Sequence, residues 1–116
     1  MAVDWSDNIV LAELADEPSL SDELADITQR LGATKTVPPH VVLNFSNVSY
    51  VGSSNIGALL AMRRVLNERK RRLVLCSVND QVWSIFLVTG LDKIFTFAPD
   101  QLTALAGIQL EEATGP

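Results

Sequence analysis

The sequence has little of what most catalytic and metal-binding sites need. Its 116 residues include one cysteine, Cys76, and one histidine, His40. A single cysteine excludes a disulfide within the chain, and a histidine without a second histidine or cysteine at ligand spacing does not make a zinc site. We therefore predict that His40, which follows two prolines, is a loop residue, and we expect no metal and no cofactor.

Motifs of enzymatic chemistry are also missing. The chain has no Gly-rich phosphate loop and no Cys/His pair, and its serines do not form a nucleophile elbow. Basic residues are absent from residues 1–26, which hold eight acids, and the net charge is −5. Nucleic acid is a poor partner for such a chain, so the sequence favours a protein that is neither an enzyme nor a nucleic-acid binder.

Charge of either sign is absent from residues 41–62, a stretch long enough to span a bilayer. The stretch contains Asn44, Asn47 and Asn55 as well as serines, and this polarity argues against a membrane helix. No signal peptide is recognisable, and Cys76 lies in an apolar run typical of a buried strand. We expect a cytoplasmic protein that does not contact a membrane, and the sequence leaves a homodimer open.

Basic residues are concentrated in one segment. Between residues 63 and 72 there are six bases and one acid. The bases are Arg63, Arg64, Arg69, Lys70, Arg71 and Arg72. They fall on the second half of a predicted helix, where cations complement the negative end of the helix dipole, so the pattern favours a solvated helix end over a binding patch.

The first half of the chain alternates strand-like and helix-like patterns. Residues 8–14 and 41–45 are apolar runs typical of strands. Between them, Ser19 and Asp22 form a capping-box pattern and Gly32 predicts the helix end. The apolar face of this predicted helix consists of Leu20, Leu24, Ile27 and Leu31.

The second half continues the alternation. A helix over residues 54–70 should present Ile56, Leu59, Leu60, Met62 and Leu66 on its apolar side. Arg63 falls within that side, so either its stem packs while the guanidinium reaches water, or this face meets something other than the core. The later expected elements are a strand over 73–78, a helix over 81–89 capped by Asn79 or Asp80 and ended by Gly90, a strand over 94–97 and a helix from Pro99 with Leu102 and Leu105.

This order of elements predicts the class of fold. Strands alternating with helices imply parallel crossovers and an α/β sheet, and the length suits one domain. Residues 1–7 and 111–116 are expected to be frayed. Trp83, Phe86 and Leu87 lie at helical spacing and are predicted to belong to the core.

The segment from Tyr50 to Leu60 joins a strand pattern to a helix pattern and carries two adjacent hydroxyls, Ser53 and Ser54. Backbone N–H groups gather at a helix N-terminus and stabilise negative charge, so a phosphoryl group is favoured there. The alternative is that Ser54 is an ordinary N-cap, worth about 1 kcal/mol to the helix and never modified.

Three segments together are similar to the STAS family, the domain shared by anti-sigma factor antagonists and the tails of sulfate transporters. They are VVLNFSNVSYVGSSNIGALLAMRR, LVLCSV and VTGLDKIFTF, in the family's order and spacing. The resemblance covers roughly residues 8–105, the expected core of a single STAS-like domain over 1–116. It implies a mixed, largely parallel sheet with helices packed mainly on one side.

The resemblance also implies a regulatory function and a site. In family antagonists a switch kinase, usually itself the anti-sigma factor, phosphorylates a hydroxyl in a D-S-S-G turn, and the unmodified domain binds that kinase. Here the second serine, the usual acceptor, is Ser54, and Ser53 is the less favoured candidate. The expected partner-binding residues are Gly52, Ser53, Ser54, Asn55, Gly57 and Arg64.

Two residues of the turn depart from the family pattern. Gly52 stands where the family has an acid, and Asn55 where it has a glycine. The family's polar and acidic signature after the first strands has Asp16 and Glu17 as its nearest equivalents. A second interpretation therefore remains: a STAS scaffold that is not phosphorylated, or a small-ligand-binding module in a signalling assembly.

Overall fold

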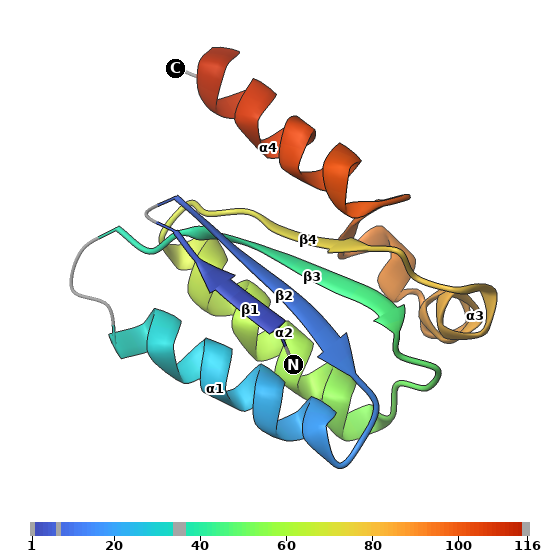
Figure 1. Cartoon of the computed structure of the whole chain (residues 1–116). Helices are drawn as coiled ribbons and strands as arrows, with labels where there is room; N and C mark the ends of the chain where they lie inside the picture. Colours follow the sequence, from blue (N-terminus) through green and yellow to red (C-terminus); the bar gives the residue numbers. More distant parts are fainter. Residues whose placement is uncertain (1, 7, 34–36, 115–116) are drawn as a thin grey trace.

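The protein is described by a computed structural model, which covers residues 2–6, 8–33 and 37–114. A five-stranded sheet has the order β1-β2-β3-β4-β5, with β1 antiparallel to β2 and all later pairs parallel (Figure 1). The strands are β1 Ala2–Trp5, β2 Ile9–Ala15, β3 His40–Asn47, β4 Leu73–Cys76 and β5 Thr96–Ala98. The helices are α1 Ser19–Ala33, α2 Ser53–Glu68, α3 Asp80–Thr89, the 3-10 helix η1 Leu91–Lys93 and α4 Gln101–Thr114.

The helices lie mainly on one side of this sheet, as predicted. Figure 1 shows α1 and α2 side by side on one face and α4 on the opposite face. Helix α3 adds Val82 and Phe86 to the same core cluster as α1 and α2. The opposite face has a smaller cluster consisting of Val42, Val74, Cys76, Ala104 and Ile108. The expectation of a mixed, largely parallel α/β sheet is confirmed.

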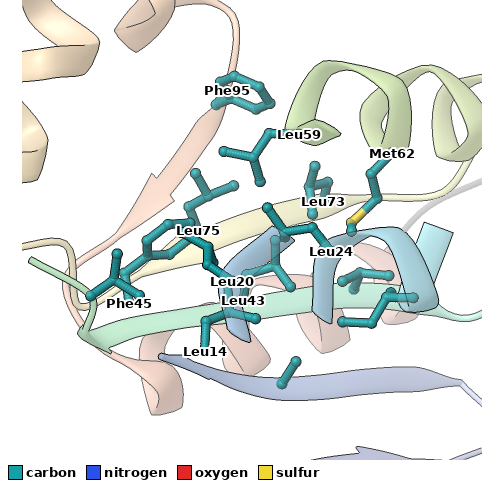
Figure 2. Packing of buried hydrophobic residues seen from close by; sticks show 14 of the residues in the cluster. Leu14, Leu20, Leu24, Leu43, Phe45, Leu59, Met62, Leu73, Leu75 and Phe95 are labelled. Carbon is teal, nitrogen blue, oxygen red and sulfur yellow. The ribbon is translucent and has the colours of Figure 1, made fainter. Parts of the chain in front are cut away.

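The main core is built from the residues whose periodicity predicted it. All four apolar positions of α1 are buried: Leu20, Leu24, Ile27 and Leu31. Leu24 belongs to the same cluster as Leu43 of β3 and Leu73 of β4 (Figure 2). On β3 the side chains alternate between the two faces, so that Val41, Leu43 and Phe45 join this core while Val42 joins the α4 cluster. Strand β3 is therefore covered on both faces.

Both expected frayed ends are ordered where the structure describes them, so that prediction is wrong. Residues 2–5 form β1, which pairs with β2 in a register that puts Val3 opposite Ala12, and the Arg30 guanidinium lies 3.8 Å from the centre of the Trp5 ring. Helix α4 continues to Thr114 because Ile108 and Ala104 anchor it to the sheet. Leu102, by contrast, is exposed. Residues 1, 7, 115 and 116 lie outside the described part of the chain.

Three local predictions in the first half are wrong. Ser19 is the first residue of α1, and the side chain that caps this end is Glu17, whose carboxylate accepts from the Ser21 N–H at 2.7 Å and the Ser21 hydroxyl at 2.6 Å. Gly32 lies inside the helix, which ends one residue later at Ala33. His40 is not a loop residue: it begins β3, is buried, and accepts a hydrogen bond from the Arg72 N–H at its Nδ1 (2.9 Å).

The basic segment is organised differently from the prediction. Helix α2 ends at Glu68, so only Arg63 and Arg64 of the six bases lie on it. Lys70 adopts a left-handed conformation with φ of 58°, and the Arg71 N–H donates back to the Leu66 carbonyl at 2.8 Å. This turn reverses the chain and directs it into β4, so the cluster does not form the last turn of a helix.

Helix α3 follows its predicted caps. Asn79 is the N-cap, with its Oδ1 accepting from the Val82 N–H at 2.9 Å, and Gly90 ends the helix with φ of 75°. Phe86 is buried, and Trp83 is half-buried with its ring edge-on to Phe97. Leu87 is exposed, so the core prediction is correct for Phe86 and wrong for Leu87.

Candidate functional site

The paired serines lie at the N-terminus of α2, just beyond the carboxyl end of β3. Gly52 is the N-cap, with extended backbone angles and no side-chain cap bond, and Ser53 is the first helical residue. Both Ser53 and Ser54 are exposed. Ser54 therefore does not cap the helix, and the interpretation of this residue as an ordinary N-cap is wrong.

The electrostatics of this helix end favour an anion. The first N–H groups of any helix lack partners within the helix and carry partial positive charge. Helix α2 has no acidic residue in its first turn, whereas α1 has Asp22 and α3 has Asp80. Negative charge added on Ser53 or Ser54 would therefore meet a dipole that no acidic side chain of the first turn compensates.

Asn55 is not part of the exposed surface. Its side chain is buried, its Oδ1 accepts from the Gly52 N–H at 2.9 Å, and its Nδ2 donates to the Ser21 hydroxyl at 3.3 Å. Because Gly52 has no side chain to cap the helix, Asn55 makes the reciprocal half of a capping box alone. Asn55 therefore contributes to this site by fixing the turn, and its side chain does not face a partner.

The loop before the serines is held by side chains from two other parts of the chain. Asp16 accepts from the Ser49 N–H at 2.8 Å, from the Ser49 hydroxyl at 2.6 Å and from the Tyr50 N–H at 3.4 Å. Asn79 donates from Nδ2 to the Val48 carbonyl at 2.8 Å while it also caps α3. Sequence reasoning identified Asn79 as a candidate cap but missed its bond to Val48, because a capping pattern does not reveal a contact to a distant loop.

The carboxylates of Asp16 and Glu17 make the stability of this region depend on pH. Hydrogen bonds from Ser49 hold the pKa of Asp16 below its ordinary value of 3.8, and those from Ser21 hold the pKa of Glu17 below 4.5. A carboxyl group with a lowered folded-state pKa stabilises the fold above its unfolded pKa, and that stabilisation is lost as pH falls through the folded pKa.

We therefore expect stability to fall below about pH 4.5, with part of the loss due to the loop contacts of Asp16. Asp16→Asn cannot bind both Ser49 donors as a carboxylate does, so it should lower stability near neutral pH and show a smaller further loss in acid. Urea unfolding midpoints between about pH 7 and pH 3 measure this difference. An acid loss in Asp16→Asn as large as in the parent would contradict the assignment.

A stripe of small and exposed residues runs along α2 from the serine pair. Successive helical residues are about 100° apart, which places Ser53, Gly57 and Arg64 on one side of the helix, opposite the buried Leu59 and Leu66. A Cβ atom at Gly57 would meet nothing within 4 Å, so the fold itself does not require glycine there. Since glycine within a helix costs about 1 kcal/mol relative to alanine, its presence fits a surface that another molecule approaches closely.

Arg63 lies on a different side of α2 from this stripe. It is half-buried, and its Nε donates to the Ile94 carbonyl at 3.2 Å. Neither alternative for Arg63 holds as stated. Its Nε binds the carbonyl of Ile94, the residue after η1, while Ile56 and Leu60 on the same side of the helix pack against the main core.

The described residues offer neither a metal site nor a membrane-spanning helix. Within residues 2–6, 8–33 and 37–114, no group of three or more His, Cys, Asp or Glu side chains could hold a metal ion. In the same part of the chain, no helix has both the length and the apolar character needed to cross a membrane. The buried Cys76 thiol has a pKa raised by desolvation, which keeps it in the unreactive thiol form.

The sheet order and the helix-borne hydroxyl pair at the end of a central strand define the class of fold. A family model described as the STAS domain matches residues 10–104, and this chain belongs to that family. A solved anti-sigma-factor antagonist (STAS) domain protein from Planctomyces limnophilus has a TM-score of 0.78 with 17% identity, covering 93% of this chain and 97% of that one. At this identity the likeness concerns the fold.

The curated relatives match this chain over only part of their length. An anti-sigma F factor antagonist from Paenibacillus polymyxa is 27% identical over 71 residues, which is 61% of this chain and 61% of the relative. An anti-sigma-B factor antagonist from Staphylococcus aureus (strain NCTC 8325 / PS 47) is 31% identical over 54 residues, 47% of this chain and 50% of the relative. The matched segment thus spans between half and two thirds of these relatives.

Proposed function

We propose that this protein is an anti-sigma factor antagonist: it binds an anti-sigma factor that is also a serine kinase of the switch type, and phosphorylation of Ser54 ends the binding. The observation that carries the proposal is the exposed hydroxyl pair in the first turn of α2, a turn without acidic residues. The curated relatives named anti-sigma factor antagonists support the choice of partner. The proposed setting is the cytoplasm, with the whole chain acting as one domain.

The proposed binding surface has two parts. One is the turn at Gly52 with Ser53 and Ser54, and the other is the exposed side of α2 with Gly57 and Arg64. Small residues near the serines let a partner approach the helix closely, and Arg64 offers a cation that a partner carboxylate can pair with. Asn55, Asp16 and Asn79 keep the turn in one conformation before the partner arrives, which lowers the entropy lost on binding.

A second candidate function is a STAS scaffold that binds partners without being phosphorylated. Gly52 favours it, because the acid that precedes the serines in the family pattern is missing and no carboxylate lies beside the hydroxyls in the first turn of α2. The two candidates share a binding surface and differ in whether Ser54 receives a phosphate. Intact mass after incubation with the cognate kinase and ATP distinguishes them.

Charge reversal at Arg64 tests the surface. Arg64→Glu should weaken binding to the anti-sigma factor about tenfold, because a rim charge that matched the partner becomes repulsive. Arg64 is exposed on the helix surface, so the variant should unfold at nearly the parent's temperature. Isothermal titration calorimetry at a fixed salt concentration measures the affinity.

Lys93→Glu is the matched control, since it makes the same change in net charge at an exposed residue of η1 away from the proposed surface. It should leave the affinity within about twofold of the parent. Equal losses in the two variants would mean that overall charge steers the association, and an unchanged affinity in Arg64→Glu would place the interface elsewhere.

A further inference from the structure

A cleft lies between helix α4 and the strands β4 and β5. Its volume is about 230 Å³, and its lining combines residues of these strands with residues of the helix. Helix α4 covers the face of the sheet opposite α1 and α2, whereas Ser53 and Ser54 belong to α2 (Figure 1). The cleft is therefore separate from the proposed partner surface.

The lining of this cleft is mostly apolar. Val74, Ala104 and Ile108 line it and also belong to the smaller core cluster on this face of the sheet, against which Ala98 packs. Water that fills an apolar cleft is displaced when an apolar molecule enters, and concave sites lined in this way are where proteins bind small molecules. The cleft thus extends the small cluster to the surface.

The charged side chains at this cleft neutralise each other. Of the residues that line it, Arg72 and Glu111 carry charge, and the Arg72 Nη1 contacts a carboxylate oxygen of Glu111. This pair leaves the lining without net charge. An ion would have to leave water for an apolar surface without gaining a partner of its own, which is unfavourable. The lining therefore favours an uncharged ligand.

Small residues of α4 keep the cleft open. Gly107 lines it from inside the helix, where glycine is less favourable than alanine. A Cβ atom at Gly107 would meet nothing within 4 Å, so the fold does not require glycine at this position. Ala104, three residues earlier, lines the same cleft with a single methyl group. The space therefore results from the choice of side chains and could be filled by a larger one.

We propose that this cleft binds a small, uncharged, mainly apolar molecule of about the size of indole. An apolar cavity of about 150 Å³ holds one benzene molecule, so the larger volume here suits a bicyclic ring. The absence of net charge in the lining selects against acids and amines of the same size. This site does not depend on the proposed anti-sigma function.

The test is a titration of the full chain with indole, followed by backbone amide chemical shifts. Binding should move the Ala98 and Gly107 amides in a saturable way and leave the Ser54 amide, on the other face of the sheet, unchanged. Indole should also raise the unfolding temperature as its concentration increases, because a ligand that binds the folded state stabilises it by mass action.

Gly107→Leu should weaken indole binding by about tenfold or more, because the new side chain takes the space of the ligand. Gly107 is exposed, and leucine is a better helix former than glycine, so the variant should unfold at the parent's temperature or above it. Ala106→Leu is the matched control. It adds a leucine at the neighbouring exposed position of α4, which does not line the cleft, and should bind indole within about twofold of the parent.

The same titration with indole-3-carboxylate tests the charge of the ligand. The acid has the same ring and one negative charge, and it should bind about tenfold more weakly than indole. The proposal is overturned if the Ala98 and Gly107 amides do not respond to indole, if Gly107→Leu binds indole as the parent does, if Ala106→Leu loses as much affinity as Gly107→Leu, or if the acid binds as tightly as indole.

Discussion

Replacing Leu24 with alanine should lower the free energy of unfolding by about 2–5 kcal/mol, as large-to-small changes in a closed core do. Leu24 is fully buried and packs in the cluster between α1, α2 and the sheet (Figure 2). Because a domain of ordinary size is stable by about 5–15 kcal/mol, this one change removes a large part of the total. Urea unfolding followed by circular dichroism measures it.

Leu102→Ala provides the matched control for the same chemical change. Leu102 is 78% exposed on α4, so its truncation should alter stability by less than about 0.5 kcal/mol. A loss in Leu24→Ala as small as that in Leu102→Ala would mean that α1 does not pack in the core.

The comparison of these two leucines shows what periodicity predicts well. The spacing of Leu20, Leu24, Ile27 and Leu31 predicts a buried face because one side of a helix repeats with that period. On α4 the same reasoning selects Leu102, which is exposed, because the side of α4 that meets the sheet carries Ala104 and Ile108. Helix α4 lies alone on its face of the sheet, and the sequence does not state which side of such a helix will meet the strands.

The sequence predicts where the site lies but not the hydrogen bonds that hold it in place. A strand pattern that runs into Ser53 and Ser54 locates the turn, since helix N-termini gather N–H groups. The contacts that fix the turn join residues far apart in the sequence: Asp16 with Ser49, and Asn55 with Ser21. Such pairs depend on how α1 packs beside α2, so no local pattern reveals them.

Phosphorylation of Ser54 is expected to reduce affinity for the anti-sigma factor by about a hundredfold or more, while the domain stays folded. A phosphoserine adds about −1.5 to −2 charges at neutral pH. An interface formed around a neutral hydroxyl would then have to bury a charge without a partner, which costs several kcal/mol, and each 1.4 kcal/mol is a factor of about ten.

The fold itself should tolerate the phosphate because of where Ser54 lies. The residue is exposed in the first turn of α2, and that turn itself contains no acidic side chain. Negative charge at that end stabilises a helix by about 0.3–1 kcal/mol. Ser54→Asp should therefore unfold at the parent's temperature or slightly above it, yet bind the partner more weakly.

Three variants assign the switch to one hydroxyl. Ser54→Ala should bind within about threefold of the parent and take no phosphate, since the interface meets a neutral side chain in both proteins. Ser53→Ala should bind and be phosphorylated almost as the parent is, because the acceptor remains in place. Ser54→Asp should show weaker binding, and its unchanged unfolding temperature would attribute that loss to charge at the contact. Phosphopeptide mapping that finds the label on Ser53, or on no residue of the turn, would reject Ser54 as the acceptor and support the unphosphorylated scaffold.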